Sequence, residues 1–258
     1  MSATLAPSRL ALRPAVVGLA SFAAVVVLVE VLIRVGLINR FIVPLPSAIV
    51  LSFWRVIVEE HVLSRFLQTA GEALSAALLI TLVGVPAGVV MQRIPVLRRA
   101  CETWVAALAA APIVLAYPLF LVIFGRNALT IIMIGFVAGL APVILKTIEG
   151  LAGTRRVLIN VGRSFNLSET QLFWKILFPA ALPTVFIGLR LGLIFALINI
   201  VAVEFLINFG GLGQLINDLA ERYDLAGTYA AICFVVLVSV LFFAATERIE
   251  RWLRPVDL

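Results

Sequence analysis

Long apolar stretches separated by short charged segments dominate this chain. A helix of roughly 20 apolar residues crosses the hydrocarbon core of a bilayer. By that measure the sequence predicts six membrane-spanning helices, near Ala15–Val35, Ala70–Met91, Cys101–Phe124, Ala128–Leu145, Leu182–Phe205 and Tyr229–Ala245. The predicted fold class is all-α transmembrane, with a membrane domain at 15–246, an amino-terminal segment at 1–14 and a carboxyl-terminal tail at 247–258. The first apolar run has no small-residue cleavage site at its end, which predicts a retained helix rather than a signal peptide.

Composition supports a membrane protein and excludes several other classes. Of the 258 residues, 63% are hydrophobic and 13% are charged, whereas soluble domains have roughly 45–50% and 25%. The net charge of +6 comes from basic residues between the spans, where such residues set topology, so nucleic-acid binding is not expected. Cys101 and Cys233 lack metal-ligand spacing, and His61 is the single histidine. No metal site is therefore predicted.

The basic residues also predict the orientation, because Lys and Arg concentrate in cytoplasmic connections. One set of connections contains thirteen of them and the opposite set contains six, with Arg190 inside a span. The richer set includes both termini, which we therefore expect in the cytoplasm. Its members are Arg9, Arg13, Arg93, Arg98, Arg99, Lys146, Arg155, Arg156, Arg163, Lys175, Arg248, Arg251 and Arg254.

The longest polar connection on the cytoplasmic side, Thr147–Pro179, has the pattern of two short helices. Apolar residues recur there at helical spacing, and Asn166-Leu167-Ser168 interrupts them as a turn. Ser168 followed by Glu169 and Gln171 predicts an amino-terminal cap for the second helix. Pro179 and Pro183 are expected to mark the entrance to the fifth span. The pattern alone leaves open whether this hairpin merely covers helix ends.

The same loop resembles the cytoplasmic coupling loop of binding-protein-dependent ABC permeases. That family has Glu-Ala-Ala, three residues, Gly, nine residues and Ile-x-Leu-Pro. Here Asn160, Val161 and Gly162 stand at Glu-Ala-Ala, Asn166 stands at Gly, and Ile176 and Pro179 keep the pattern, while Phe178 replaces leucine. Asn is the commonest substitute for Gly in a left-handed turn. The resemblance implies that the residues contacting an ATPase are Asn160, Val161, Gly162, Arg163, Asn166, Leu167, Ser168, Glu169, Ile176 and Pro179.

Three further stretches are similar to permeases of the sulfonate, taurine, nitrate, bicarbonate and thiamine-precursor class. They are Val43–Ala48, Pro112–Gly125, and Val203-Glu204-Phe205 followed by Gly210–Gly213. The resemblance implies a type I importer subunit in a bacterial cytoplasmic membrane. Its expected partners are two ABC ATPases, a second permease copy or paralogue, and a periplasmic or lipoprotein solute-binding protein. No phosphate-binding loop occurs in the sequence, so ATP and Mg are expected on the ATPase, and this chain is expected to be neither an enzyme nor a cofactor-binding protein.

Polar residues and backbone breakers within the spans predict the translocation path or gate. Ionisable groups inside a membrane are costly and indicate function by default. Glu204 and Asn199 make the fifth span polar, and Tyr117 lies between Pro112 and Pro118. Gly211 and Gly213 permit a chain reversal into the external vestibule, which the resemblance implies is a gate. For Glu204 and Asn199, structural pairing with neighbouring helices is an equally open alternative, and for the glycines the alternative is an ordinary external turn.

Other polar residues in the spans are expected to be structural. Glu30 and Arg34 have the spacing of a local ion pair. Glu72 and Glu102 are placed near span ends, where headgroups hydrate them. The main alternative function is an ion-coupled secondary transporter or channel that works without an ATPase. Such a protein would be expected to show inverted repeats and a coupling acid near the midplane, which the sequence does not display.

Overall fold

The computed structural model describes residues 14–253, and helices account for most of them. In chain order they are α1 (Pro14–Arg34), α2 (Pro46–Glu59), α3 (Val62–Arg93), α4 (Pro95–Ala110), η1 (Ile113–Ala116), α5 (Tyr117–Phe124), α6 (Ala128–Ala152), α7 (Arg156–Ser164), α8 (Glu169–Leu172), η2 (Phe173–Leu177), α9 (Phe178–Ile207), α10 (Gly211–Glu221) and α11 (Leu225–Leu253). Within this part of the chain, five helices are long and apolar enough to cross a membrane, and a bent pair could form a sixth span. The predicted all-α transmembrane class is confirmed. The expected amino-terminal segment lies mostly outside the described residues, and the expected tail is helical as far as Leu253.

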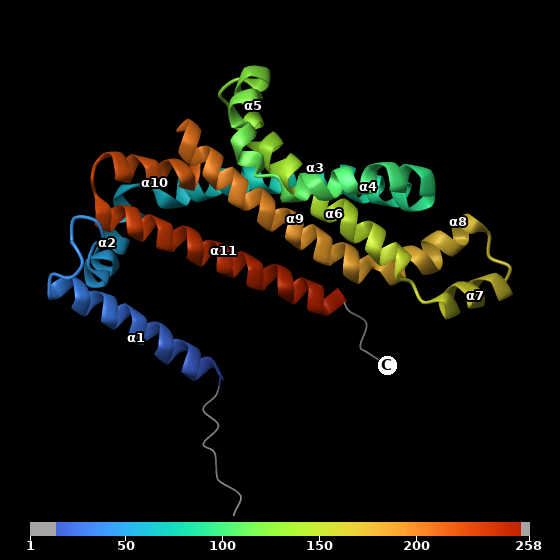
Figure 1. Cartoon of the computed structure of the whole chain (residues 1–258), viewed down its shortest axis with the longest axis horizontal. Coiled ribbons are helices and arrows are strands. Elements are labelled where there is room, and N and C mark those ends of the chain that lie inside the picture. Colours follow the sequence, from blue (N-terminus) through green and yellow to red (C-terminus); the bar gives the residue numbers. More distant parts are fainter. Residues whose placement is uncertain (1–13, 254–258) are drawn as a thin grey trace, which may run out of the picture.

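Helices α3, α6 and α9 pack together as the centre of the molecule (Figure 1). α6 is the most buried of the candidate spans. It crosses α9 where Gly139 meets Gly192, and a methyl group added at Gly139 would lie 2.4 Å from the Gly192 carbonyl oxygen. Two side-chain-free positions therefore let the two backbones touch, as in other closely packed membrane helices.

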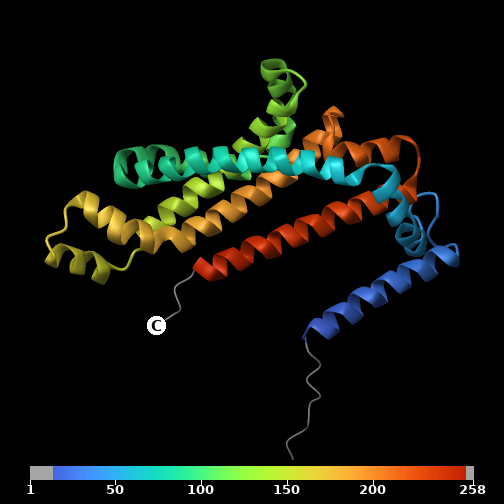
Figure 2. The same ribbon diagram turned by 180° about the vertical axis from the view of Figure 1, so that it is seen from behind.

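The two ends of this centre carry different elements. At one end, called here the α10 end, α10 packs on α2, α3, α9 and α11. At the other end, the α7 end, α7 and α8 form a hairpin beyond the ends of α3 and α6 (Figures 1 and 2). α1 lies apart from the centre in both views. It is held to α2 by Glu30, which pairs with Arg34 at 2.6 Å and accepts a bond from the Ser47 hydroxyl at 2.9 Å. The predicted local pair is confirmed.

The predicted third span, Cys101–Phe124, is not one helix. α4 and the η1–α5 segment meet at an angle of 90°, and α5 projects away from the centre in both views (Figures 1 and 2). The break falls at Ala111, which is extended with φ −74° and ψ 133°. The following Pro112 disfavours a helical conformation at Ala111, and it has no N–H to continue the helix.

Two other boundaries were predicted wrongly. The fifth span does not begin at Leu182, because α8, η2 and α9 form an unbroken helical run from Glu169 to Ile207 that contains both Pro179 and Pro183. η2 is a single π-helical turn, and such turns accommodate local irregularity in a helix. α3 begins at Val62 rather than Ala70, so Glu72 lies about three turns from the start of the helix and not at its end. Glu72 is consequently buried, with the Gln68 amide 3.3 Å away, and is not hydrated at a span end.

Candidate coupling hairpin and α10 anchor

The turn between α7 and α8 is a Schellman motif followed directly by a capping box. Asn166 has φ +54°, the Leu167 N–H donates to the Gly162 carbonyl at 3.1 Å, and the Asn166 N–H donates to the Arg163 carbonyl at 2.9 Å. The Ser168 hydroxyl then accepts from the Gln171 N–H, and the Gln171 side chain accepts from the Ser168 N–H. The predicted turn and cap are confirmed, and together they fix the angle between the two helices.

Gly162 is the point of contact between the two arms of this hairpin. A methyl group at Gly162 would lie 2.5 Å from Leu172 Cδ1 and 2.6 Å from Ile176 Cδ1. Glycine therefore lets α7 lie directly on the side chains of α8 and η2. Because Leu172 is buried by this contact, the hairpin is a packed unit and not a loose loop.

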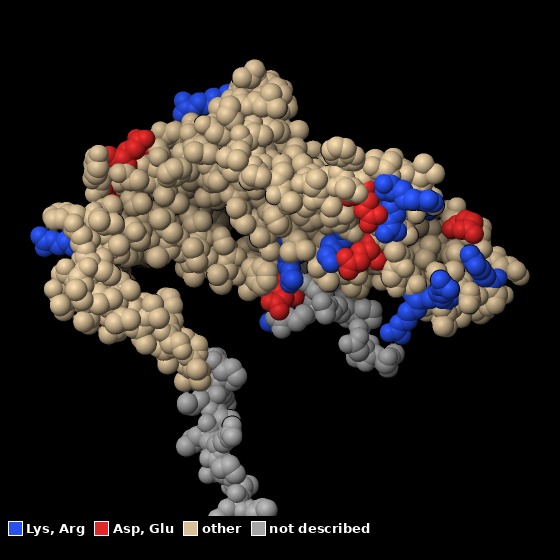
Figure 3. Space-filling model, in the orientation of Figure 1, with Lys and Arg blue, Asp and Glu red and all other residues tan. Residues whose placement is uncertain are grey.

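The outer face of α7 carries both apolar and basic side chains. Val157, Val161 and Phe165 are exposed there, beside exposed Arg156 and Arg163. Figure 3 shows Lys and Arg side chains gathered at this end of the molecule. An exposed apolar strip with a basic surround is typical of a surface that another protein covers.

The residues predicted to contact an ATPase all lie on this hairpin or at its junction with α9. Gly162 is buried, Leu167 and Ile176 are half-buried, and the remaining seven are exposed, namely Asn160, Val161, Arg163, Asn166, Ser168, Glu169 and Pro179.

The reasoning from sequence did not find the cation–π contact at the base of the hairpin. The Arg93 guanidinium lies 4.1 Å from the centre of the Phe173 ring, and Trp174 and Phe178 pack on the same ring. This cluster joins η2 to the end of α3. The aromatic spacing at 173, 174 and 178 was visible in the sequence, but its cationic partner lies 80 positions away.

Substitutions of Asn166 test the turn. Valine at φ +54° costs about 1–2 kcal/mol, whereas glycine has no such cost. We expect Asn166→Val to raise the rate of trypsin cleavage at Arg163 by about tenfold, since about 1.4 kcal/mol is a factor of ten in the opened population. Asn166→Gly is expected to leave the rate near wild type. Equal rates in the two variants would contradict the assigned turn.

At the α10 end, the first turn of α10 is anchored on the buried carboxylate of Glu204. Glu204 is 0% exposed. It accepts from the Gly213 N–H at 2.8 Å and from the Thr69 hydroxyl at 2.7 Å. The Thr69 oxygen in turn accepts from the Leu212 N–H at 2.9 Å. A carboxylate at a helix amino terminus satisfies N–H groups that have no partner within the helix.

The glycines before and within this turn are required by the close fit. A methyl group at Gly213 would lie 2.1 Å from the Val201 carbonyl oxygen. Gly211 has φ +75°, and a methyl group there would lie 2.2 Å from the Glu204 carboxylate. α10 therefore approaches α9 as closely as backbones can, and it returns alongside α3 and α9.

Of the five predicted path or gate residues, the structure brings three together. Glu204, Gly211 and Gly213 form the α10 anchor. Asn199 lies elsewhere on α9 and donates to its own helix at the Phe195 carbonyl, at 2.9 Å. Tyr117 begins α5 and packs against the central apolar cluster of α3, α6 and α9.

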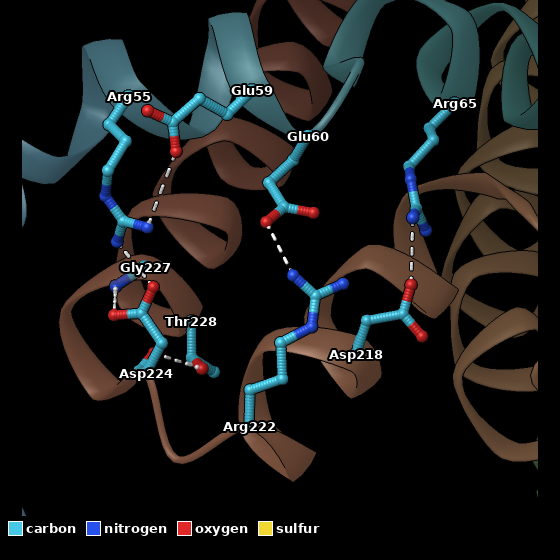
Figure 4. Close-up of polar contacts among 9 residues, drawn as sticks. All are labelled: Arg55, Glu59, Glu60, Arg65, Asp218, Arg222, Asp224, Gly227 and Thr228. Atoms are coloured by element: carbon cyan, nitrogen blue, oxygen red, sulfur yellow. Dashed lines mark hydrogen bonds and ion pairs between the residues drawn. The ribbon is translucent and has the colours of Figure 1, made fainter.

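Three ion pairs tie the α10 region to α2 and the start of α3 (Figure 4). Arg65 pairs with Asp218 at 2.8 Å, Arg222 pairs with Glu60 at 2.8 Å, and Arg55 pairs with Asp224. A separate contact joins the α5–α6 connection to the end of α9, where the Arg126 guanidinium donates to the Ile207 carbonyl at 2.8 Å. Sequence reasoning missed these pairs because each one joins distant segments.

The Asp224 carboxyl gives this region a predictable pH response. Burial would raise its pKa, but the Arg55 guanidinium and the Gly227 N–H outweigh burial and hold the pKa below its usual value. A lowered folded-state pKa stabilises the fold above the unfolded value of about 3.9, and this contribution is lost as pH falls through the folded value. We expect Asp224→Asn to flatten the pH dependence of the unfolding temperature below about pH 4, with no change in slope at neutral pH. An unchanged acid limb would contradict the pairing.

The least exposed pair should resist salt best. Side-chain exposures are 23% and 17% for Arg65 and Asp218, against 57% and 12% for Arg222 and Glu60. The coupling energy of each pair is measured in double-mutant cycles in which the charged residues are replaced by Gln or Asn. Raising the salt concentration from about 0.1 M to about 1 M shortens the Debye length from ~10 to ~3 Å. We expect that change to remove most of the Arg222–Glu60 coupling, itself below about 1 kcal/mol, and less of the Arg65–Asp218 coupling. The reverse order would show that exposure does not rank these pairs.

Comparison with known proteins identifies the family to which this architecture belongs. Residues 80–255 match the family described as binding-protein-dependent transport system inner membrane component. The chain belongs to this family. The predicted resemblance is therefore confirmed, and the chain is the membrane-spanning permease of a transport system.

Relatives and solved structures agree with this assignment. The permease is 27% identical over 183 residues to the taurine transport system permease protein of Escherichia coli (strain K12), a match covering 71% of this chain and 66% of that protein. It is 25% identical over 234 residues to a putative aliphatic sulfonates transport permease protein of Bacillus subtilis (strain 168), covering 91% and 85%. The inward-facing MetNI methionine ABC transporter has the same fold, with a TM-score of 0.66 at 20% identity, covering 75% of this chain and 97% of that one.

Proposed function

We propose that this permease forms the translocation path of an ATP-driven importer in a bacterial cytoplasmic membrane, with the α7 end in the cytoplasm and the α10 end outside. The orientation rests on the basic residues gathered at the α7 end, since cytoplasmic connections are rich in Lys and Arg. Two ABC ATPases, carrying ATP and Mg, would bind the α7–α8 hairpins of this chain and of a second permease copy or paralogue.

The observation that carries this proposal is the hairpin itself. It is locked by its turn, packed through Gly162 and continuous with α9, yet its outer face remains apolar and exposed. The helical run from Glu169 to Ile207 has 39 residues, which is about 58 Å at 1.5 Å per residue. It joins the proposed ATPase contact to Glu204, which anchors α10.

This continuity supports a mechanical account of transport. ATP binding would bring the two ATPases together and move the hairpins as rigid bodies. α9 would carry that displacement to the α10 anchor, so that the outer mouth opens or closes as the ATPases change state. Such a switch is a shift between two conformations, each stabilised by a different nucleotide state of the partner.

The cargo we propose is a small anion or small organic nutrient, delivered by a periplasmic or lipoprotein solute-binding protein. Named relatives support this class, since they are described as permeases for taurine, aliphatic sulfonates, bicarbonate and formylaminopyrimidine. Nitrate belongs to the proposed cargo class because the sequence also resembles nitrate permeases. The spans contain few charged residues, which favours selection of the cargo by the solute-binding protein.

The test is to purify the tagged permease from its native host in mild detergent and identify its partners. We expect an ABC ATPase to co-purify, together with uptake of a radiolabelled member of the proposed cargo class that depends on this chain. An intact oligomer that contains no ATPase and still drives uptake would overturn the proposal in favour of an ion-coupled transporter.

A further inference from the structure

A second buried carboxyl group, that of Glu72 on α3, lies against the α10 anchor. Glu72 is 4% exposed and Glu204 is 0% exposed. The two carboxyl groups lie close enough to share a hydrogen bond. Ionisable groups at such depth in a membrane protein are costly and indicate function by default. Two acidic side chains therefore meet in a site without solvent, and only one of them, Glu204, bonds to α10.

The hydrogen bonds of the two carboxyl groups differ. Both Glu204 oxygens accept from donors, Oε1 from the Thr69 hydroxyl at 2.7 Å and Oε2 from the Gly213 N–H at 2.8 Å. Glu72 Oε1 accepts from the Gln68 amide at 3.3 Å, whereas Glu72 Oε2 is buried without a donor. Two ionised carboxylates cannot bond to each other, because both only accept hydrogen bonds. A proton on Glu72 Oε2 gives that oxygen a hydrogen bond to donate.

No basic side chain compensates the two acids among the side chains that the structure describes. Arg65, about two turns before Glu72 on α3, pairs with Asp218 of α10 at 2.8 Å. Arg126, in the α5–α6 connection, donates to the Ile207 carbonyl at the end of α9. Two like charges in contact in a buried site raise the free energy strongly, so one of the two groups keeps its proton.

We propose that Glu72 and Glu204 bind one proton between them, with Glu204 ionised and Glu72 protonated. The donors on both Glu204 oxygens stabilise the charged form there. Glu72 is then a positioning residue, which donates to Glu204 and holds it against α10. A single negative charge remains at the first turn of α10, where the helix dipole favours it.

Loss of this proton would loosen α10. The first turn of α10 is bonded to both helices, through the Gly213 N–H to Glu204 of α9 and through the Leu212 N–H to Thr69 of α3. Repulsion between two ionised acids pushes α3 and α9 apart at this point, and one of these bonds must then break. Release of α10 is therefore expected as pH rises. That this release opens the outer mouth rests on the proposed function, whereas the shared proton does not.

The first test looks for the proton itself. Infrared spectra of the complete permease complex in lipid at about pH 7 distinguish protonated from ionised carboxyl groups by the carbonyl stretch. Ordinary Asp and Glu side chains are ionised there, because they titrate near about 3.9 and 4.3. We expect a protonated-carboxyl band in the difference spectrum between wild type and Glu72→Gln. The matched control is Glu149→Gln, which alters a 62% exposed side chain on α6 and should give no such band. A Glu72→Gln difference spectrum without the band would overturn the proposal.

The second test follows α10 through amide hydrogen exchange at Leu212 and Gly213, corrected for the intrinsic effect of pH on exchange. Between about pH 7 and about pH 10 we expect the opened population to rise about tenfold or more in wild type and in Glu149→Gln. Glu72→Gln cannot ionise, yet its amide can still donate to Glu204, so it should show no rise. An equal rise in wild type and Glu72→Gln would contradict the shared proton.

A metal cation between the two carboxylates is the alternative occupant of this site. It would leave both acids ionised, so that the protonated band is absent and exchange at α10 responds to Na⁺ or to a chelator instead of to pH. That result would overturn the proposal. Neither readout involves cargo or ATP turnover. Failure of the proposal would therefore leave the import function standing, and a permease that holds no ATPase would still show the shared proton.

Discussion

Replacing Gly162 with leucine is expected to abolish import and release the ATPase. The new side chain would begin 2.5 Å from Leu172 Cδ1 and 2.6 Å from Ile176 Cδ1, so α7 must move off the second arm. Overpacking of this kind costs about 1–3 kcal/mol. A cost of about 2 kcal/mol lowers the population of the native hairpin by roughly 30-fold.

The measurement compares ATPase retention and cargo uptake in wild type, Gly162→Leu and Gly71→Leu. Gly71 lies on α3, and no atom outside its own helix approaches its position within 4 Å, so it controls for the added leucine. We expect Gly71→Leu to behave as wild type in both assays, with similar amounts of each variant in the membrane. If Gly162→Leu kept both its ATPase and its uptake, the hairpin would not be the coupling element.

Replacing Glu204 with leucine is expected to be the most destabilising single change at the α10 end. It removes the acceptor of the Gly213 N–H and of the Thr69 hydroxyl in a site without solvent. Leaving each of these donors buried and unpaired costs about 1–3 kcal/mol. Glu204→Gln keeps one acceptor oxygen and should cost less.

Thermal unfolding of the purified permease measures this cost. Glu149→Leu is the control, because Glu149 is a surface residue, 62% exposed, whose pair with Lys146 is local; it should lower the midpoint only slightly. We also expect Gly213→Val to resemble Glu204→Leu, since both prevent α10 from seating on α9. Equal midpoints for Glu204→Leu and Glu149→Leu would show that Glu204 does not anchor α10.

The sequence predicts well those features that depend on interactions between residues close together in the chain. Apolar runs located the long helices, and Ser168 with Gln171 located a cap that the structure confirms as a capping box. Asn166 lies in the predicted turn and is left-handed, as the family resemblance implied from its place at the family's glycine. In each case the deciding interactions join residues within a few positions of one another.

What the sequence did not predict depends on distant contacts. Pro112 explains why the helix breaks at Ala111, but the sequence does not specify the angle of 90° between the two parts, which depends on how α5 packs. The burial of Glu72 and Glu204 depends on where α3 begins and on the return of α10. The pairs from Arg55, Arg65 and Arg222 join α2 and α3 to α10 and the start of α11 across more than 150 positions, and no local pattern specifies them.

The central claim, that an ATPase docks on the α7–α8 hairpin in the cytoplasm, is tested most directly by photo-crosslinking in cells. A photoreactive phenylalanine analogue replaces Phe165, on the hairpin and 75% exposed, or Phe41, between α1 and α2 and 74% exposed. The account predicts a cross-link to an ABC ATPase from position 165 and none to it from position 41. An ATPase captured from position 41, or none from position 165 in an intact complex, would contradict it.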